Sequence, residues 1–169
     1  MAWEADVLSV LKENSISLVV YLPDTALGGI IETVEADDWF TAVNVAREEE
    51  AIGVLSGGWL GGQRGALLVQ SSGLANTLNA IGSLSKPARI PFLGLVSRRG
   101  DLGEFNLAQV PFGYNMPTLL DTMGIRNHSL AETDTVARDV DMAAKSAFST
   151  EEPYVVMLES TLIGAKDEY

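Results

Sequence analysis

The chain has 169 residues, a length that predicts one domain with a sizeable core and leaves no room for two catalytic domains. Its formal net charge of -12 argues against nucleic acid as a partner, and the absence of cysteine excludes disulfides, thiolate metal sites and cysteine nucleophiles. No apolar run is long enough to span a membrane and no leader pattern opens the chain, so we expect a cytoplasmic protein.

Segments with helical apolar spacing alternate with short β-branched runs, which is the pattern of an α/β fold. In chain order we expect a helix over 2–14, strand 17–22, helix 26–35, strand 39–45, helix 48–60, strand 65–70, helix 74–84, strand 90–97, helix 117–123, strand 125–129, helix 134–148 and strand 154–158. This order predicts a single-domain, mostly parallel sheet of about six strands with helices on both faces. The loop over 98–114 is long enough to be functional, and 164–169 is expected to be a frayed tail.

The first candidate functional residue is Glu48, at the start of the third expected helix. Ala51, Ile52, Leu55 and Trp59 follow at helical spacing, so the carboxylate of Glu48 falls on the apolar stripe of the helix. A carboxylate in such a setting loses contact with water and becomes able to share a proton with a weakly basic ring nitrogen.

Two further features of this helix have simple structural interpretations. Glu49 and Glu50 lie in the first turn, where acidic side chains complement the positive end of the helix dipole. Glycines at 53, 57 and 58 remove side chains from the other faces, so we expect the helix to be buried nearly all round.

The second candidate is the segment Gln70-Ser71-Ser72-Gly73-Leu74-Ala75-Asn76, which follows the third expected strand. Open α/β sheets bind ligands at the carboxyl ends of their strands. Polar side chains and free helix N–H groups there suit an anion or a polar heterocycle. The same residues also occur in turns without a ligand, and they do not match a P-loop.

The third candidate is Arg98 with Arg99, directly after the fourth expected strand, together with Gln109 further along the loop. Bases outnumber acids between residues 47 and 99, although the whole chain is acidic, so a small anion would be drawn to this part. Adjacent arginines could hold a carboxylate or a sulfonate, or they could form surface ion pairs. The single histidine, His128, lies in a weak strand and is interpreted as structural.

Motifs in a specific order resemble the alpha subunit of sulfopyruvate decarboxylase, the pyrimidine-binding half of a thiamine diphosphate enzyme related to phosphonopyruvate decarboxylase. The resemblance covers about residues 17–121. The motifs are Leu22-Pro23-Asp24-Thr25, Arg47-Glu48-Glu49-Glu50-Ala51 with Gly57, Gln70 to Asn76, Leu78-Asn79-Ala80, Ser97 with Arg99-Gly100, and Ala108-Gln109-Val110-Pro111.

The resemblance implies a pyrimidine-binding domain over 1–163 and decarboxylation of a small anionic 2-oxo acid, such as sulfopyruvate or phosphonopyruvate. It implies that Glu48 is catalytic and hydrogen-bonds N1′ of the aminopyrimidine, which favours the imino tautomer of the cofactor. The implied cofactor-binding residues are Glu48, Pro23, Asp24, Gln70, Ser72, Gly73 and Asn76. The implied substrate-binding residues are Asp24, Ser71, Ser72, Arg98, Arg99 and Gln109.

Thiamine diphosphate enzymes hold Mg²⁺ and the diphosphate through a Gly-Asp-Gly motif followed by a later Asn. This chain has only Gly100-Asp101-Leu102-Gly103, so no metal ligand is expected in it. A beta subunit is therefore expected to bring the diphosphate and Mg²⁺ site, in a hetero-oligomer of alpha-beta pairs with the cofactor between the two folds.

Four departures from the family pattern bear on the substrate. They are Arg98 where the family has histidine, Ser71 where it has asparagine, Ala75 where it has glycine, and Asp24 where the sulfopyruvate enzymes have cysteine. Another thiamine diphosphate reaction, carboligation to a 2-hydroxy ketone, remains an alternative within enzymes. Outside enzymes, the alternative is a non-catalytic α/β subunit that binds a small anion or regulates a larger complex.

Overall fold

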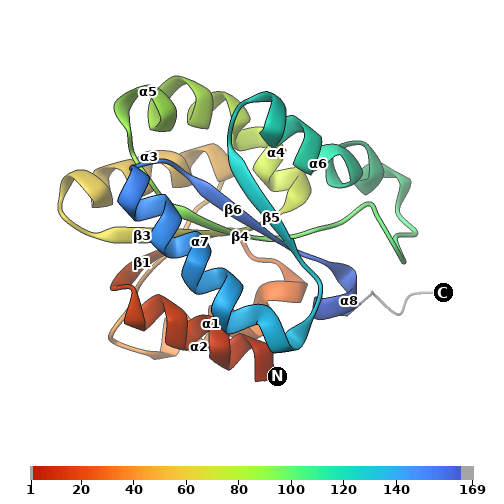
Figure 1. Cartoon of the computed structure of the whole chain (residues 1–169), viewed down its shortest axis with the longest axis horizontal. Coiled ribbons are helices and arrows are strands. Elements are labelled where there is room, and N and C mark those ends of the chain that lie inside the picture. Colours follow the sequence, from red (N-terminus) through yellow and green to blue (C-terminus); the bar gives the residue numbers. More distant parts are fainter. Residues whose placement is uncertain (1, 165–169) are drawn as a thin grey trace.

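The computed structural model describes residues 2–164, which form alternating strands and helices (Figure 1). The elements are α1 (Ala2–Glu13), β1 (Ile16–Tyr21), η1 (Thr25–Leu27), α2 (Gly28–Ala36), β2 (Thr41–Asn44), α3 (Glu48–Leu60), β3 (Arg64–Gln70), α4 (Ser71–Ala80), the π-helical turn η2 (Ile81–Ser85), α5 (Lys86–Ala88), β4 (Leu93–Ser97), η3 (Leu107–Gln109), α6 (Val110–Thr122), β5 (Arg126–Leu130), η4 (Thr133–Thr135), α7 (Val136–Thr150), β6 (Tyr154–Leu158) and α8 (Ser160–Ile163). The expected tail at 165–169 lies outside the described residues.

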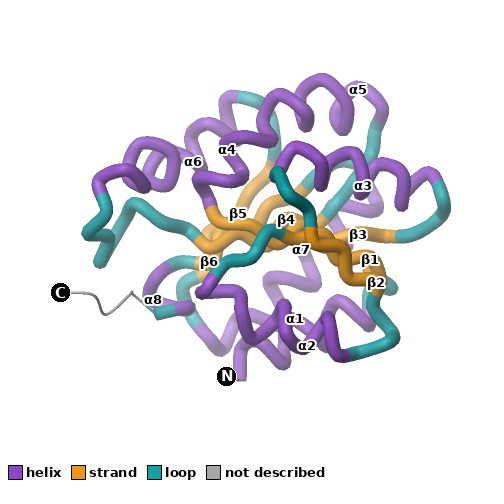
Figure 2. Tube along the Cα trace, turned by 180° about the vertical axis from the view of Figure 1, so that it is seen from behind, coloured by secondary structure: helices purple, strands orange, loops and turns teal. Residues whose placement is uncertain are grey.

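The strands form one parallel sheet in the order β2-β1-β3-β4-β6-β5. Helices cover both faces: α1, α2 and α7 pack on one side, and α3, α4 and α6 on the other (Figure 2). This confirms the expected α/β architecture and shows that all six strands are parallel. No described helix has the length and apolar character needed to cross a bilayer.

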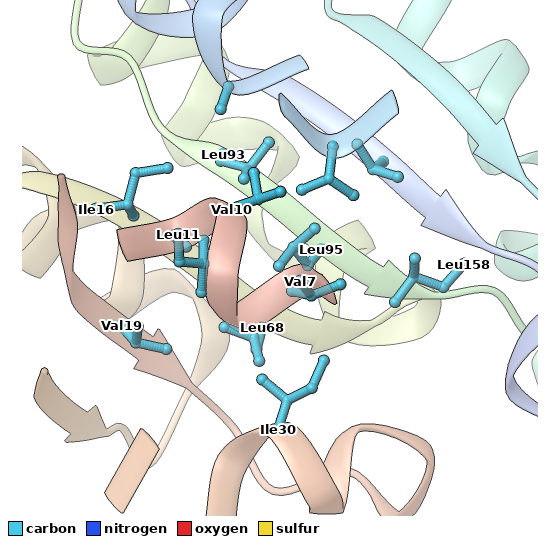
Figure 3. Close-up of a cluster of buried hydrophobic side chains, with 14 of the residues drawn as sticks. Val7, Val10, Leu11, Ile16, Val19, Ile30, Leu68, Leu93, Leu95 and Leu158 are labelled. Carbon is cyan, nitrogen blue, oxygen red and sulfur yellow. The ribbon is translucent and has the colours of Figure 1, made fainter. Parts of the chain in front are cut away.

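Alternating side chains of the central strands supply the two layers of core. Val19, Leu68 and Leu95 belong to the layer beneath α1 and α2, which Figure 3 shows in close-up. Leu67 and Val69 belong to the opposite layer, beneath α3 and α4. Because both faces are covered, the strands read as nearly continuous apolar runs, and each fully buried leucine contributes roughly 1.5–3 kcal/mol.

Helix α4 begins at Ser71, three residues before the expected start at 74, so the expected gap between strand and helix over 71–73 is wrong. Strand β3 ends at Gln70, whose extended backbone caps the helix directly. Serine and glycine are as common in a first helical turn as in a loop, so composition could not distinguish the two.

Helix α6 also begins earlier than expected, at Val110 rather than near Pro117. Pro111 fits the first turn, where no backbone N–H is needed. Pro117 lies inside the helix, where it cannot donate to the carbonyl of Gly113. Arg98 Nε donates to that carbonyl instead, at 3.3 Å. A distant side chain therefore compensates for an interior proline that sequence analysis takes for a helix start.

Helix α3 is buried on one side only, so the expectation of burial nearly all round is wrong. Ala51, Ile52 and Leu55 face the sheet, whereas Gly53 and Gly57 are exposed and a Cβ added at either would meet no atom within 4 Å. The helix belongs to an outer layer, and nothing in the described chain covers its outer face.

The loop after β4 packs against α6 backbone to backbone. Gly100 has φ +82°, and a Cβ there would lie 2.5 Å from the carbonyl oxygen of Gln109. A Cβ on Gly113 would lie 1.9 Å from the carbonyl oxygen of Arg99. Side chains are therefore excluded from this contact on both sides.

Gly100→Ala should destabilise the protein more than Gly62→Ala. Gly62 has a similar φ of +87° but open space around it, so it serves as the matched control for backbone strain alone. We expect an additional loss of roughly 1–3 kcal/mol for Gly100→Ala, the usual cost of overpacking, measured by urea denaturation. Equal losses for the two variants would contradict the close contact.

Candidate active site

The predicted site residues follow strands whose carboxyl ends meet at one edge of the sheet. β1, β3 and β4 are neighbours in the sheet, so the segments after Tyr21, Gln70 and Ser97 emerge side by side. Glu48 begins α3, after the edge strand β2. The structure thus gathers the candidates at the edge where α/β sheets bind ligands.

Glu48 is half-buried and held by two residues of α4. Its Oε2 accepts a hydrogen bond from Asn76 Nδ2 at 3.1 Å. Its Oε1 lies beside Gly73, where an added Cβ would be only 2.6 Å away. The missing side chain at 73 therefore makes room for the carboxylate, and the amide of Asn76 orients it.

The neighbouring acids have the structural roles expected for a first helical turn. Glu50 accepts from the backbone N–H groups of Ala46 and Arg47, at 3.1 and 3.4 Å. Glu49 accepts from the Arg47 guanidinium at 3.0 Å. The pKa of Glu49 lies below its usual value, first because of a backbone hydrogen bond and then because of Arg47.

The segment 70–76 joins this region to the loop after β4. Gln70 Nε2 donates to Ser72 Oγ at 2.5 Å, and the buried Ser71 Oγ accepts from the backbone N–H of Arg99 at 3.1 Å. Ser71 therefore fixes the start of α4 relative to the two arginines.

A cavity of about 280 Å³ opens beside the ends of β1, β4 and β6. The residues that line it are Asp24, Thr25, Ala26, Arg98, Arg99, Gly100, Asp101, Leu102, Gly103, Glu104, Phe105, Ser160, Ile163 and Gly164. The structure thus brings three predicted residues to one cavity. The lining of this cavity does not include Glu48, the segment 70–76 or Gln109, so the candidates fall into two groups.

Asp24 caps the helical turn η1. Its Oδ1 accepts from the backbone N–H groups of Ala26 and Leu27, at 2.8 and 3.2 Å. Asp24 also borders a more open depression of about 300 Å³, together with Pro23 and Thr25. The position of the Asp24 carboxylate is therefore fixed by these two backbone hydrogen bonds.

The Arg98 side chain contacts its own loop, the residue after β6 and the first turns of α6. Its Nη1 lies 2.8 Å from Glu159 Oε1, and its Nη2 lies 2.9 Å from Asp101 Oδ2. It also donates to the carbonyl oxygens of Gly113 and Tyr114. Two carboxylates and two carbonyls already occupy this guanidinium.

Arg99 pairs with Glu104 through two parallel hydrogen bonds of 2.7 and 2.9 Å. The side chains are 16% and 4% exposed. Glu104 also accepts from the backbone N–H groups of Gly100 and Asn106. These donors, first Arg99, lower the pKa of Glu104 to about 2 despite its burial.

The remaining predicted residues lie apart from the cavity. Gln109 has a buried Oε1 with no hydrogen-bond partner among residues 2–164. His128 lies on the edge strand β5, is half exposed, and has its Nε2 3.6 Å from Asp139 Oδ2. No group of three or more His, Cys, Asp or Glu side chains in the described part of the chain could hold a metal ion.

Sequence reasoning did not single out Glu104 or Glu159, the two partners of the arginines. Glu104 lies only five residues from Arg99, within the same loop. The sequence could therefore have suggested an ion pair between the two. Glu159 is 61 residues from Arg98, and only the pairing of β4 with β6 brings them together.

Relatives of this chain are known, although no family model matches it. It is 36% identical over 154 residues to the sulfopyruvate decarboxylase subunit alpha of Methanococcus maripaludis, and the match covers 91% of this chain and 92% of that one. It is 30% identical to the sulfopyruvate decarboxylase of Methanosarcina acetivorans, over 92% of this chain but 39% of that protein. It is 36% identical to the phosphonopyruvate decarboxylase of Streptomyces viridochromogenes, over 62% of this chain and 26% of that protein.

Among solved structures, the chain is similar to a 2-oxoglutarate:ferredoxin oxidoreductase from Magnetococcus marinus, with a TM-score of 0.78 and 15% identity. The likeness covers 96% of this chain and 29% of that one. At this identity it shows a shared fold. The sequence relatives are those that the ordered motifs indicated.

Because of the Glu104–Arg99 ion pair, the free energy of unfolding should depend on pH. Because the folded-state pKa of Glu104, about 2, lies below the usual 4.5, the stabilisation is present above pH 4.5 and is lost as the pH falls toward 2. Glu104→Gln should therefore be less stable than the natural chain at pH 7, by at most about 3 kcal/mol. The difference should shrink between pH 4.5 and 2.

Urea denaturation at several pH values would measure this difference. Asp101→Gln, at a more exposed carboxylate of the same loop, is the control and should change stability less. A Glu104→Gln difference that does not vary with pH would show that the ion pair does not stabilise the fold.

Proposed function

The chain belongs to the family of sulfopyruvate decarboxylase alpha subunits, and from this premise we propose that it is the pyrimidine-binding subunit of a thiamine diphosphate-dependent decarboxylase. The proposed substrate is a small anionic 2-oxo acid such as sulfopyruvate or phosphonopyruvate, the acids in its relatives' names. The observation that carries the proposal is the carboxylate of Glu48, oriented by Asn76 beside a glycine at the ligand-binding edge of the sheet.

The residues around Glu48 fit the pyrimidine ring of thiamine diphosphate. Gly73 leaves backbone without a side chain next to Oε1, so a flat ring could approach it closely. Asn76 occupies Oε2, which leaves Oε1 to share a proton with a ring nitrogen. Pro23, Asp24, Gln70 and Ser72 complete the proposed cofactor-binding set.

When bound, thiamine diphosphate supplies a thiazolium ring that accepts the electron pair released as carbon dioxide leaves. The task of this chain is to hold the pyrimidine and to keep a proton at its ring nitrogen through Glu48. Water in the first turn of α3 would compete for that proton, so the half-buried position of Glu48 favours the transfer. Positioning and proton sharing are thus the chain's own contributions.

For the substrate we propose the cavity lined by Asp24, Arg98 and Arg99. The proposed substrate-binding set also includes Ser71, Ser72 and Gln109, which do not line this cavity. Arg98 uses four of its five N–H groups for carboxylates and carbonyls of the chain. Arg99 uses Nε and Nη2 for Glu104, which leaves Nη1 for a substrate anion. Of the two arginines, Arg99 is therefore the better candidate for a direct contact.

A partner completes the proposed enzyme. The match covers 92% of the Methanococcus maripaludis alpha subunit but only 39% of the Methanosarcina acetivorans protein. We propose that a separate beta subunit corresponds to the remainder and carries the diphosphate and Mg²⁺ site, in alpha-beta pairs. The cytoplasmic location stays a prediction.

Glu48→Gln should lower decarboxylase kcat/KM of the assembled enzyme by at least about 100-fold, because a neutral amide cannot share the proton in the same way. Assembly should be unaffected, since Gln keeps an oxygen for Asn76. Turnover would be measured as carbon dioxide release from sulfopyruvate and phosphonopyruvate.

Glu49→Gln is the matched control, because it neutralises the adjacent carboxylate, which pairs only with Arg47 at the surface. It should leave turnover nearly unchanged. Full activity of Glu48→Gln would sink the proposal. Product analysis with and without an aldehyde acceptor separates decarboxylation from carboligation.

A further inference from the structure

Asp24 differs from the other two acids that line the cavity, because no described cation pairs with it. Asp101 Oδ2 lies 2.9 Å from Arg98 Nη2, and Glu104 Oε2 lies 2.7 Å from Arg99 Nε. The hydrogen bonds that Asp24 accepts from residues 2–164 come from two backbone N–H groups, and both reach Oδ1. Its Oδ2 is therefore an acceptor that the described chain leaves without a donor.

Arg99 supplies the opposite kind of group to the same cavity. Its Nε and Nη2 are bound to Glu104, so Nη1 is a donor that no residue among 2–164 uses. Thr25 and Ser160 also line the cavity, but a hydroxyl can donate or accept and therefore suits either kind of ligand atom. A guanidinium only donates and a carboxylate only accepts. Selection between ligands thus depends on Arg99 and Asp24.

A carboxylate that only accepts distinguishes the two oxyanions in the relatives' names, phosphonate and sulfonate. A phosphonate that keeps one proton has an O–H to donate and other oxygens that accept, so it matches one free acceptor and one free donor. A sulfonate is fully ionised near neutral pH and has only acceptors, so one of its oxygens would face another acceptor at Asp24. A site that hydrogen-bonds a substrate O–H strongly rejects an analogue that lacks it.

The charges around the cavity help a phosphonate to keep its proton. The charged side chains that line the cavity, border the depression beside Asp24 or pair with Arg98 are Asp24, Glu32, Arg98, Arg99, Asp101, Glu104 and Glu159. Acids outnumber bases in this set, so a doubly charged tail is disfavoured relative to a singly charged one. The proton that the phosphonate retains is the one that Asp24 accepts.

We propose that Asp24 and Arg99 together select a 2-oxo acid with a singly protonated phosphonate tail over one with a sulfonate tail. The inference rests on the proposed function and narrows its substrate to phosphonopyruvate. Arg99 Nη1 donates to one phosphonate oxygen, and Asp24 Oδ2 accepts from the phosphonate O–H. Asp24 is the specificity-determining residue, because the guanidinium suits either anion.

Asp24→Asn tests this selection, because the backbone fixes which way the new amide points. The N–H groups of Ala26 and Leu27 need an acceptor, so the amide oxygen takes the place of Oδ1 and the NH₂ group takes that of Oδ2. Asparagine caps a helical turn about as well as aspartate does, so folding should be unaffected. The substitution thus turns the free acceptor into a donor, which suits a sulfonate.

The natural chain and Asp24→Asn are each assembled with the proposed beta subunit and thiamine diphosphate, and kcat/KM for carbon dioxide release is measured with both acids. We expect the natural enzyme to prefer phosphonopyruvate by at least about 100-fold, and Asp24→Asn to lower that ratio by at least about tenfold. The natural preference should fall as the pH rises above about 6, where phosphoryl groups lose their second proton. The ratio for Asp24→Asn should not fall over this range.

Glu32→Gln is the matched control, because Glu32 borders the open depression beside Asp24 but does not line the cavity. Removing its charge should leave the ratio of the two kcat/KM values unchanged. Equal changes of the ratio in Glu32→Gln and Asp24→Asn would indicate a general charge effect and would overturn the role assigned to Asp24.

A ratio that is the same in the natural enzyme and in Asp24→Asn would also overturn the proposal, as would a natural preference for sulfopyruvate. If neither acid releases carbon dioxide, the proposed function fails, and binding to the chain alone decides the inference. Isothermal titration calorimetry then compares phosphonoacetate with sulfoacetate, two unreactive acids that differ in the oxyanion. Tighter binding of phosphonoacetate that Asp24→Asn abolishes supports the selection, whereas equal or absent binding refutes it.

Discussion

The bidentate ion pair between Arg99 and Glu104 is the contact on which the candidate active site depends. With two backbone N–H groups also bound to Glu104, it closes the loop after β4 into a fixed shape, and that shape forms a wall of the cavity. Removing one partner would leave a nearly buried charge unpaired, which costs far more than a surface pair gains. The two adjacent arginines therefore have structural partners first, and the pair with Glu104 leaves Nη1 of Arg99 for the proposed substrate contact.

The candidate residues at the sheet edge form two groups. α3 and α4 hold Glu48 between Asn76 and Gly73, where we propose that a proton is shared, while the loops after β1 and β4 form a cavity with both signs of charge. Ser71 connects them, because its hydroxyl bonds the backbone of Arg99 from the first turn of α4. The hydrogen bond thus fixes α4 relative to the loop after β4, although the lining of the cavity beside Arg99 does not include Glu48.

Two parts of the molecule expose residues that other described residues do not cover. The outer face of α3 shows Gly53 and Gly57 to solvent, and Leu102, Leu107, Phe112 and Tyr114 are exposed on the loop after β4 and on α6. Exposed apolar side chains are costly for an isolated protein, and large exposed apolar surfaces usually mark interaction sites. The family relationship supports the same conclusion, since single-chain relatives carry the matching segment as only part of a longer protein.

The sequence by itself determined the α/β class, the six strands, the helix start at Glu48 and the family, because periodicity and ordered motifs are local properties of the chain. It misplaced the starts of α4 and α6, since serine, glycine and proline suit a first helical turn as well as a loop. Only the tertiary structure decided which charges meet. Glu159 reaches Arg98 through the pairing of β4 with β6, and Arg98 in turn serves the carbonyl that Pro117 leaves without a donor. Such contacts join residues far apart in the chain, and no local pattern encodes them.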